Sequence, residues 1–154
     1  MKGALTILVD GDACPVKPEV FKVAERYNVP VVVVANSFVN LPRHPLFSRM
    51  IVGDGFDAAD DWIAEQADGA SIVVTADVPL AARAVKAGAT AISPAGKPFT
   101  EAGIGLALAT RNLMTELRAA GEVTSGPRAF SARDRSTFLS ALDEAVNRLR
   151  RKGL

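Results

Sequence analysis

The chain of 154 residues contains a single cysteine and a single histidine. One cysteine excludes an intramolecular disulfide and fits a reducing compartment. No apolar run approaches the roughly 20 residues that a membrane-spanning helix requires, and the short apolar run before Asp10 is too brief for the core of a signal peptide. We therefore expect a soluble, cytoplasmic protein with no membrane partner.

The chain also lacks a strong net charge, since 18 Lys and Arg face 17 Asp and Glu. It is therefore not a polycation built to coat nucleic acid, but its charges are unevenly placed. Residues 54–77 contain seven acids and no Lys or Arg, whereas residues 111–154 contain nine Lys and Arg and five acids. An acidic patch beside a basic segment fits a metal site next to a groove for an anionic substrate. Solvated helix faces explain the same pattern equally well.

Apolar runs alternate with segments of helical periodicity along the chain. The run at 31–35 is entirely apolar and mostly β-branched, which indicates a strand buried on both faces, as in a parallel sheet. The predicted strands are 4–9, 31–35, 50–52, 71–75 and 90–92. The predicted helices are 15–27, 57–67, 78–87, 101–120 and 132–149.

This alternation predicts an α/β fold, with three α/β/α layers around a five-stranded, mostly parallel sheet and further helices at the C-terminal end. No internal repeat, low-complexity tract or linker divides the sequence. Its length also suits one ordinary domain, so we expect residues 1–154 to form a single domain. The sequence sets no oligomeric state and is compatible with a homo-oligomer.

Carboxylates follow two of the predicted strands at the point where each strand ends. Asp10 and Asp12 come directly after the first strand, and Asp77 follows the strand at 71–75. Because the carboxyl ends of parallel strands meet at one edge of a sheet, where ligands bind, these acids should converge. Asp12 and Asp77 have an alternative role as caps of the helices that follow them.

Three more acids, Asp57, Asp60 and Asp61, lie in the first turns of the helix predicted at 57–67. Asp57 shares a helix face with each of the other two, at spacings of three and four residues. The helix dipole alone favours acids at this position, so they fit a structural role as well as a ligand role.

Several carboxylates in one crevice repel one another unless a cation neutralises them. Ligands that are all oxygen favour Mg²⁺ or Mn²⁺ over Zn²⁺. Such an ion activates water and holds a phosphate, which is the chemistry of phosphodiester hydrolysis. Asn36 and Ser37, after the strand at 31–35, are candidate substrate contacts or turn residues. Arg111 and Arg118 share one helix face and are candidate phosphate-binding residues.

Four segments carry a resemblance to a known family over nearly the whole chain, in order and at compatible spacing. They are Val9–Pro15 (VDGDACP), Phe56–Ile63 (FDAADDWI), Val74–Ala81 (VTADVPLA), and Ser125-Gly126-Pro127 with Asp134 and Phe138. In these segments the chain is similar to the YaiI/YqxD family of bacterial proteins. The proposed relationship of that family is to the PIN-like nuclease superfamily.

The resemblance implies a sheet of order 3-2-1-4-5 and a Mg²⁺- or Mn²⁺-dependent nuclease. We expect its substrate to be RNA, with other nucleic acids, including single-stranded DNA, left open. It implies that Asp10, Asp61 and Asp77 are metal ligands. Asp12, Asp57 and Asp60 would then lie in or next to the coordination sphere. Asp10, Asp12, Asp61 and Asp77 would form the catalytic set.

Two other functions remain open. An Asp-x-Asp pair after a strand is also the opening signature of haloacid-dehalogenase-type phosphatases, in which Asp10 would be the nucleophile and Asp12 the acid/base. No segment clearly supplies the later lysine of that class. A non-catalytic nucleic-acid-binding module would instead use the basic carboxyl end and keep the acids as structural residues.

Overall fold

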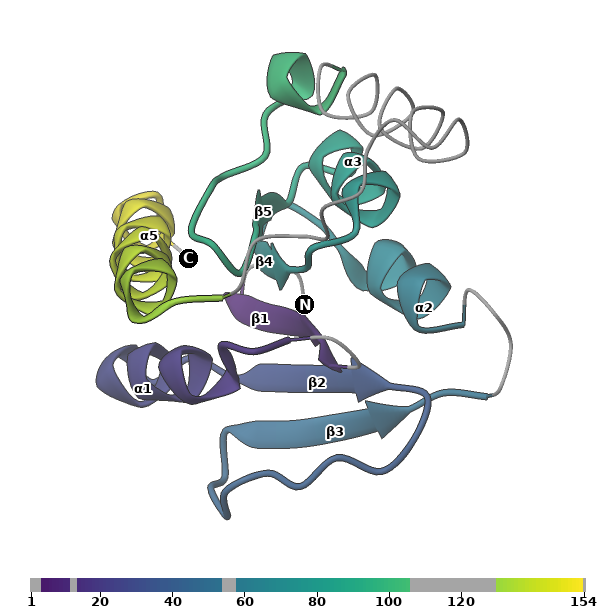
Figure 1. Cartoon of the computed structure of the whole chain (residues 1–154), viewed down its shortest axis with the longest axis vertical. Coiled ribbons are helices and arrows are strands. Elements are labelled where there is room, and N and C mark those ends of the chain that lie inside the picture. Colours follow the sequence, from purple (N-terminus) through teal and green to yellow (C-terminus); the bar gives the residue numbers. More distant parts are fainter. Residues whose placement is uncertain (1–3, 12–13, 54–57, 106–129, 154) are drawn as a thin grey trace.

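The structure is a computed structural model that describes residues 4–11, 14–53, 58–105 and 130–153. At its centre is a five-stranded parallel sheet of order β3-β2-β1-β4-β5 (Figure 1). The strands are β1 (Thr6–Asp10), β2 (Val31–Ala35), β3 (Phe47–Ile51), β4 (Ser71–Val74) and β5 (Thr90–Ile92). The predicted fold class and the predicted order of the sheet are thus confirmed.

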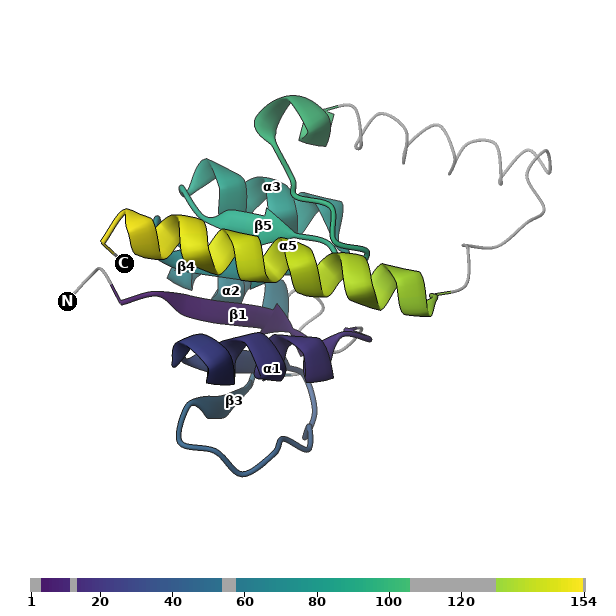
Figure 2. The ribbon, with the colours of Figure 1, turned by 90° about the vertical axis from the view of Figure 1, so that its left-hand side faces the viewer.

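Helices cover both faces of the sheet, which gives three layers. Figures 1 and 2 show α1 (Lys17–Tyr27) and α5 (Ala132–Arg151) side by side on one face. The opposite face carries α2 (Ala58–Gln66) and α3 (Val78–Lys86). The central strands therefore face a helix layer on either side, which is why their sequences are apolar without alternation.

Strand β1 shows how each residue serves one of two cores. Ile7 and Val9 pack in the core beneath α1 and α5, whereas Leu8, between them, packs in the core beneath α2 and α3. All three side chains are buried. Full burial of such a side chain contributes about 1.5–3 kcal/mol, so the two cores hold β1 firmly at the middle of the sheet.

Strand β3 differs from its prediction, since it begins at Phe47 and not at 50. It pairs with β2 over its whole length, from Phe47 beside Val31 to Ile51 beside Ala35. As an edge strand it buries only Phe47, and the four residues after it are exposed. The polar Ser48 and Arg49 therefore break the apolar pattern from which the prediction was made.

The predicted capping pattern before the last helix is confirmed. The Ser131 hydroxyl accepts from the Asp134 amide, and the Asp134 carboxylate accepts from the Ser131 amide. Residues 101–105 are helical, as predicted for the start of the helix at 101–120. The rest of that helix and the turn Ser125-Gly126-Pro127 lie outside the described residues.

No helix in the described part of the chain is long and apolar enough to cross a membrane. The longest of them, α5, has 20 residues, but eight of these are charged.

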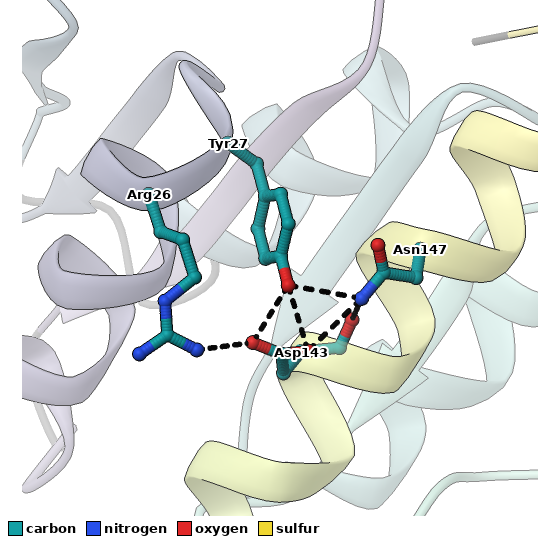
Figure 3. A network of polar contacts seen from close by, with 4 residues as sticks. All are labelled: Arg26, Tyr27, Asp143 and Asn147. Carbon is teal, nitrogen blue, oxygen red and sulfur yellow. Dashed lines mark hydrogen bonds and ion pairs between the residues drawn. The ribbon is translucent and has the colours of Figure 1, made fainter.

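A polar network around Asp143 fastens α5 to α1 (Figure 3). The Asp143 carboxylate accepts from Arg26 at 2.6 Å and from the Tyr27 hydroxyl at 2.9 Å. The Asn147 amide donates to the same hydroxyl at 3.0 Å and to Asp143 Oδ1 at 2.9 Å. The hydrogen bond that Arg26 donates to Asp143 raises the pKa of the Arg26 guanidinium above its usual value. The Tyr27 hydroxyl thus orients two side chains of α5, those of Asp143 and Asn147.

We expect Tyr27→Phe to lower the free energy of unfolding by about 1 kcal/mol, because it removes a hydroxyl with two partners and keeps the ring. Urea denaturation measures the change. Ser140→Ala, on an exposed face of α5, is the control and should change stability by less than about 0.5 kcal/mol. Equal stability of Tyr27→Phe and the unmodified protein would show that the hydrogen bonds of the Tyr27 hydroxyl add nothing.

Candidate functional site

The carboxyl ends of three adjacent strands bring the predicted polar residues to one edge of the sheet. Asp10 ends β1, Asn36 and Ser37 follow β2, and Asp77 follows β4. Asp10 lies beside Val34 of β2, and Val9 lies beside Val74 of β4. The register therefore places the carboxylate of Asp10 between the ends of its two neighbours, as the sequence predicted.

The hydroxyl of Thr75 joins the two acidic strand ends. It donates to Asp10 Oδ2 at 2.9 Å and accepts from the backbone amide of Asp77 at 3.0 Å. Thr75 is only 2% exposed, so this link is shielded from water. Sequence reasoning did not select Thr75 as a site residue, although its place in Thr-x-Asp directly after a strand was the available signal.

Asp77 caps the helix that follows it. Its Oδ1 accepts from the Leu80 amide at 3.1 Å, and Pro79 occupies the first turn of α3. The capping alternative is therefore confirmed. It uses one carboxylate oxygen, and Oδ2 has no hydrogen bond to the described residues. The cap is compatible with a role for Asp77 as a metal ligand, which stays a prediction.

Gly11 follows Asp10 at a point where the chain runs close to β2. A Cβ built at Gly11 would lie 2.6 Å from Val33 Cγ1 and 3.0 Å from the Val34 carbonyl oxygen. Both distances are shorter than ordinary packing allows, so a side chain there would push the turn away from the sheet. The glycine lets the backbone after Asp10 stay against β2.

The two predicted site residues of α2, Asp60 and Asp61, lie in different surroundings. Asp61 is 57% exposed, and its carboxylate accepts from Arg83 of α3 at 2.9 Å. Asp60 is partly buried and lies three residues before the buried Ile63, which puts it on the side of α2 that faces the sheet. Spacing in the sequence did not separate these roles, because Arg83 lies 22 residues away.

Four predicted site residues, Asp12, Asp57, Arg111 and Arg118, lie outside the described residues. Among the residues that are described, no group of three or more His, Cys, Asp or Glu comes together in a way that could hold a metal ion. The convergence seen at the carboxyl edge is thus between Asp10 and the Thr75–Asp77 turn.

The atoms at this edge that would bind a metal ion are the oxygens of carboxylate and hydroxyl groups. That chemistry fits Mg²⁺ or Mn²⁺, and Mg²⁺ commonly takes only one or two protein carboxylates, with waters and substrate phosphate as its other ligands. Asp10 and Asp77 have the ligand type and the number that such an ion requires.

Cys14 lies just beyond the same strand end and is partly buried against the core below α1 and α5. Burial raises the pKa of its thiol above the usual value. A raised pKa leaves less thiolate at neutral pH, and the thiolate is the nucleophile. The side chain therefore serves packing and is a poor nucleophile.

Comparison with known proteins places the chain among uncharacterised bacterial relatives. Residues 8–148 match the family described as "Uncharacterized BCR, YaiI/YqxD family". The chain is 65% identical over 153 residues to UPF0178 protein RPA2191 of Rhodopseudomonas palustris, covering 99% of this chain and 97% of that protein. It is 62% identical over 148 residues to a UPF0178 protein of Nitrobacter winogradskyi, covering 96% and 94%. No solved structure matched the chain.

We expect Thr75→Val to lower the free energy of unfolding by about 1–3 kcal/mol, because it removes a buried hydroxyl and leaves the part-buried Asp77 amide without its acceptor. Thr75→Ser keeps the hydroxyl and is the matched control, with a smaller loss. Urea denaturation of both variants measures the difference. A larger loss for Thr75→Ser than for Thr75→Val would show that the methyl group, and not the hydroxyl, matters.

We also expect Cys14 to react more slowly than an exposed thiol with iodoacetamide at pH 7.5, because burial raises its pKa. The midpoint of the rate against pH should lie above the value for free cysteine, about 8.5. Mass spectrometry of the alkylated protein at a series of pH values measures this midpoint. A midpoint below that of free cysteine would contradict the packing role.

Proposed function

This chain belongs to the YaiI/YqxD family, and we propose that it is a cytoplasmic, divalent-metal-dependent nuclease that hydrolyses phosphodiester bonds of RNA. The observation that carries the proposal is the link from Asp10 through the Thr75 hydroxyl to Asp77, on adjacent central strands. This is the edge at which open α/β sheets bind ligands. The strand order 3-2-1-4-5 supports the relation to PIN-like nucleases, which is itself part of the proposal.

In this proposal Asp10 and Asp77 hold a Mg²⁺ or Mn²⁺ ion, and Asp12 and Asp57 keep the role in or next to the coordination sphere that the family resemblance implies. When bound, such an ion favours ionisation of a water and neutralises phosphate charge. Thr75 is a positioning residue, because its hydrogen bond to Oδ2 fixes the rotation of the Asp10 carboxylate. The single cysteine supports the cytoplasmic placement.

The substrate contacts in the proposal come from around the same edge. Asn36 and Ser37 are exposed at the end of β2, where they can donate to the sugar–phosphate backbone. Arg111 and Arg118 keep their predicted role in binding phosphate. The basic segment of the sequence thus supplies cations for the substrate, while the acids hold the metal.

We propose that Asp60, and not Asp61, is the acid of α2 that assists at the site. Asp60 is on the sheet-facing side of the helix, and α2 packs against β1 and β2. Asp61 instead forms an ion pair with Arg83 at the surface. This differs from the role that the family resemblance implies for Asp61.

We expect the purified protein to cut single-stranded RNA in the presence of Mn²⁺ or Mg²⁺ and to stop when EDTA removes the ion. Asp10→Asn should reduce the rate at least about 100-fold, because a positioned charge at such a site contributes several kcal/mol to the transition state. Asp60→Asn should reduce the rate more than Asp61→Asn does. Gel electrophoresis of end-labelled RNA measures the rates, with Glu65→Gln, an exposed acid near the other end of α2, as the control.

Three outcomes would contradict the proposal. Cutting that persists in Asp10→Asn identifies a contaminating nuclease. Phosphate bound covalently to Asp10 after reaction with a phosphomonoester identifies a haloacid-dehalogenase-type phosphatase. Binding of RNA without metal and without cutting, unchanged by Asp77→Asn, identifies a non-catalytic binding module.

A further inference from the structure

The segment that joins β2 to β3 has the composition of a surface for an anionic, aromatic ligand. Residues 26–53 contain no Asp or Glu, Arg49 lies in β3, and the joining segment itself includes Arg43 and His44. It passes outside β3 at the free edge of the sheet (Figures 1 and 2). Phe38 is 64% exposed, the largest exposed fraction among the large apolar side chains of the described residues.

Arg49 holds the ring of Phe38 in place. Its Nε donates to the Val39 carbonyl at 3.0 Å, and its Cζ lies 4.5 Å from the centroid of the Phe38 ring. One face of the ring is thus covered by a guanidinium, and the high exposure of Phe38 leaves room for a flat group on the other face. The Nη groups of Arg49 make no hydrogen bond or ion pair with the described residues, so they are available to an anion.

A hollow of about 510 Å³ lies next to this pair, with Arg43, His44 and Arg49 among its lining residues. The His44 ring stacks on Phe47 at 4.7 Å, and its Nδ1 accepts from the Leu46 amide at 3.1 Å. These contacts fix the position of the His44 ring, which forms one wall of the hollow. Arg43 is exposed and has no hydrogen bond or ion pair within the described part of the chain.

We infer that this surface, the Phe38–Arg49 surface, binds single-stranded nucleic acid, with a base stacked on Phe38 and phosphates on Arg43 and Arg49. An exposed aromatic beside unpaired cations is the combination by which proteins hold single strands without reading their sequence. The inference rests on the proposed function for its substrate class. It extends that function by naming the surface along which the nucleic acid runs away from Asp10 and Asp77.

The path is short. Phe38 lies four residues after Val34, the register partner of Asp10, so at most about 14 Å of extended chain separates them. Asn36 and Ser37 lie between these two points in the chain. A strand of a few nucleotides thus reaches from the carboxyl edge, past Asn36 and Ser37, to Phe38.

A second pair of Phe and Arg side chains, elsewhere on the protein, supplies a matched control. Phe130 is 36% exposed and also carries a guanidinium, with Arg135 Cζ 5.1 Å from its ring. Arg135, however, donates to the Pro15 carbonyl at 2.7 Å and pairs with Glu19 at 3.2 Å. Its charge is therefore already engaged, and we expect this second Phe–Arg pair not to bind phosphate.

The test is fluorescence anisotropy of the full chain with a fluorescein-labelled oligouridine of about 12 nucleotides, in EDTA so that no cutting occurs. Phe38→Ala should raise Kd roughly 5- to 100-fold, the loss of one stacked base. Arg43→Ala should weaken binding and lower the slope of log Kd against log salt by about 0.7, the loss of one phosphate contact. Phe130→Ala should leave Kd unchanged. Circular dichroism confirms that each variant is folded.

Two results would overturn the inference. One is an affinity for oligouridine that neither Phe38→Ala nor Arg43→Ala changes. The other is a dimer of the protein, seen by light scattering, that Phe38→Ala dissociates without altering RNA affinity. That result would assign the surface to a contact between two copies through the edge strand β3.

Failure of the inference differs from failure of the proposed function. If Mn²⁺-dependent cutting requires Asp10 but Phe38→Ala binds RNA normally, only the surface is wrong. If Phe38→Ala weakens binding but no metal supports cutting, the surface stands and the nuclease activity does not.

Discussion

One buried hydroxyl ties together the two strand ends on which the site depends. Thr75 donates to Asp10 and accepts from the Asp77 amide, and Asp77 in turn caps α3 through the Leu80 amide. The carboxylate of β1 is therefore linked, bond by bond, to the first turn of the helix that follows β4. Such a chain of hydrogen bonds fixes the orientation of Asp10, which would preorganise it for the metal role that we propose.

Much of the fold could be predicted because the central strands are buried on both faces. Continuous apolar runs such as Val31–Ala35 and Ser71–Val74 mark strands of this kind, and the carboxylates that follow strands mark the edge where they end. Strand β3 was placed too late because an edge strand with only Phe47 buried has no such run. The different surroundings of Asp60 and Asp61 escaped prediction, since an ion pair with Arg83 depends on how two helices pack.

The charges of the molecule fit a division between two neighbouring regions. The acids cluster in residues 54–77, whereas residues 26–53 are free of acids and carry the Phe38–Arg49 surface. Both regions border the carboxyl edge, one through α2 and the turn at Asp77, the other through the end of β2. If the protein is the nuclease that we propose, the acidic region holds a cation and the region of residues 26–53 holds the polyanion that the cation acts on.

The central claim, a divalent cation held between Asp10 and Asp77, is tested most directly by the anomalous difference map of a crystal soaked in Mn²⁺. We predict one strong peak between the two carboxylates, within about 2.0–2.4 Å of an oxygen of each, the range for hard divalent cations. The peak should vanish in Asp10→Asn, while Thr75 keeps its bond to the Asp77 amide. A map with no peak at this edge, or with a peak only elsewhere on the protein, would contradict the claim.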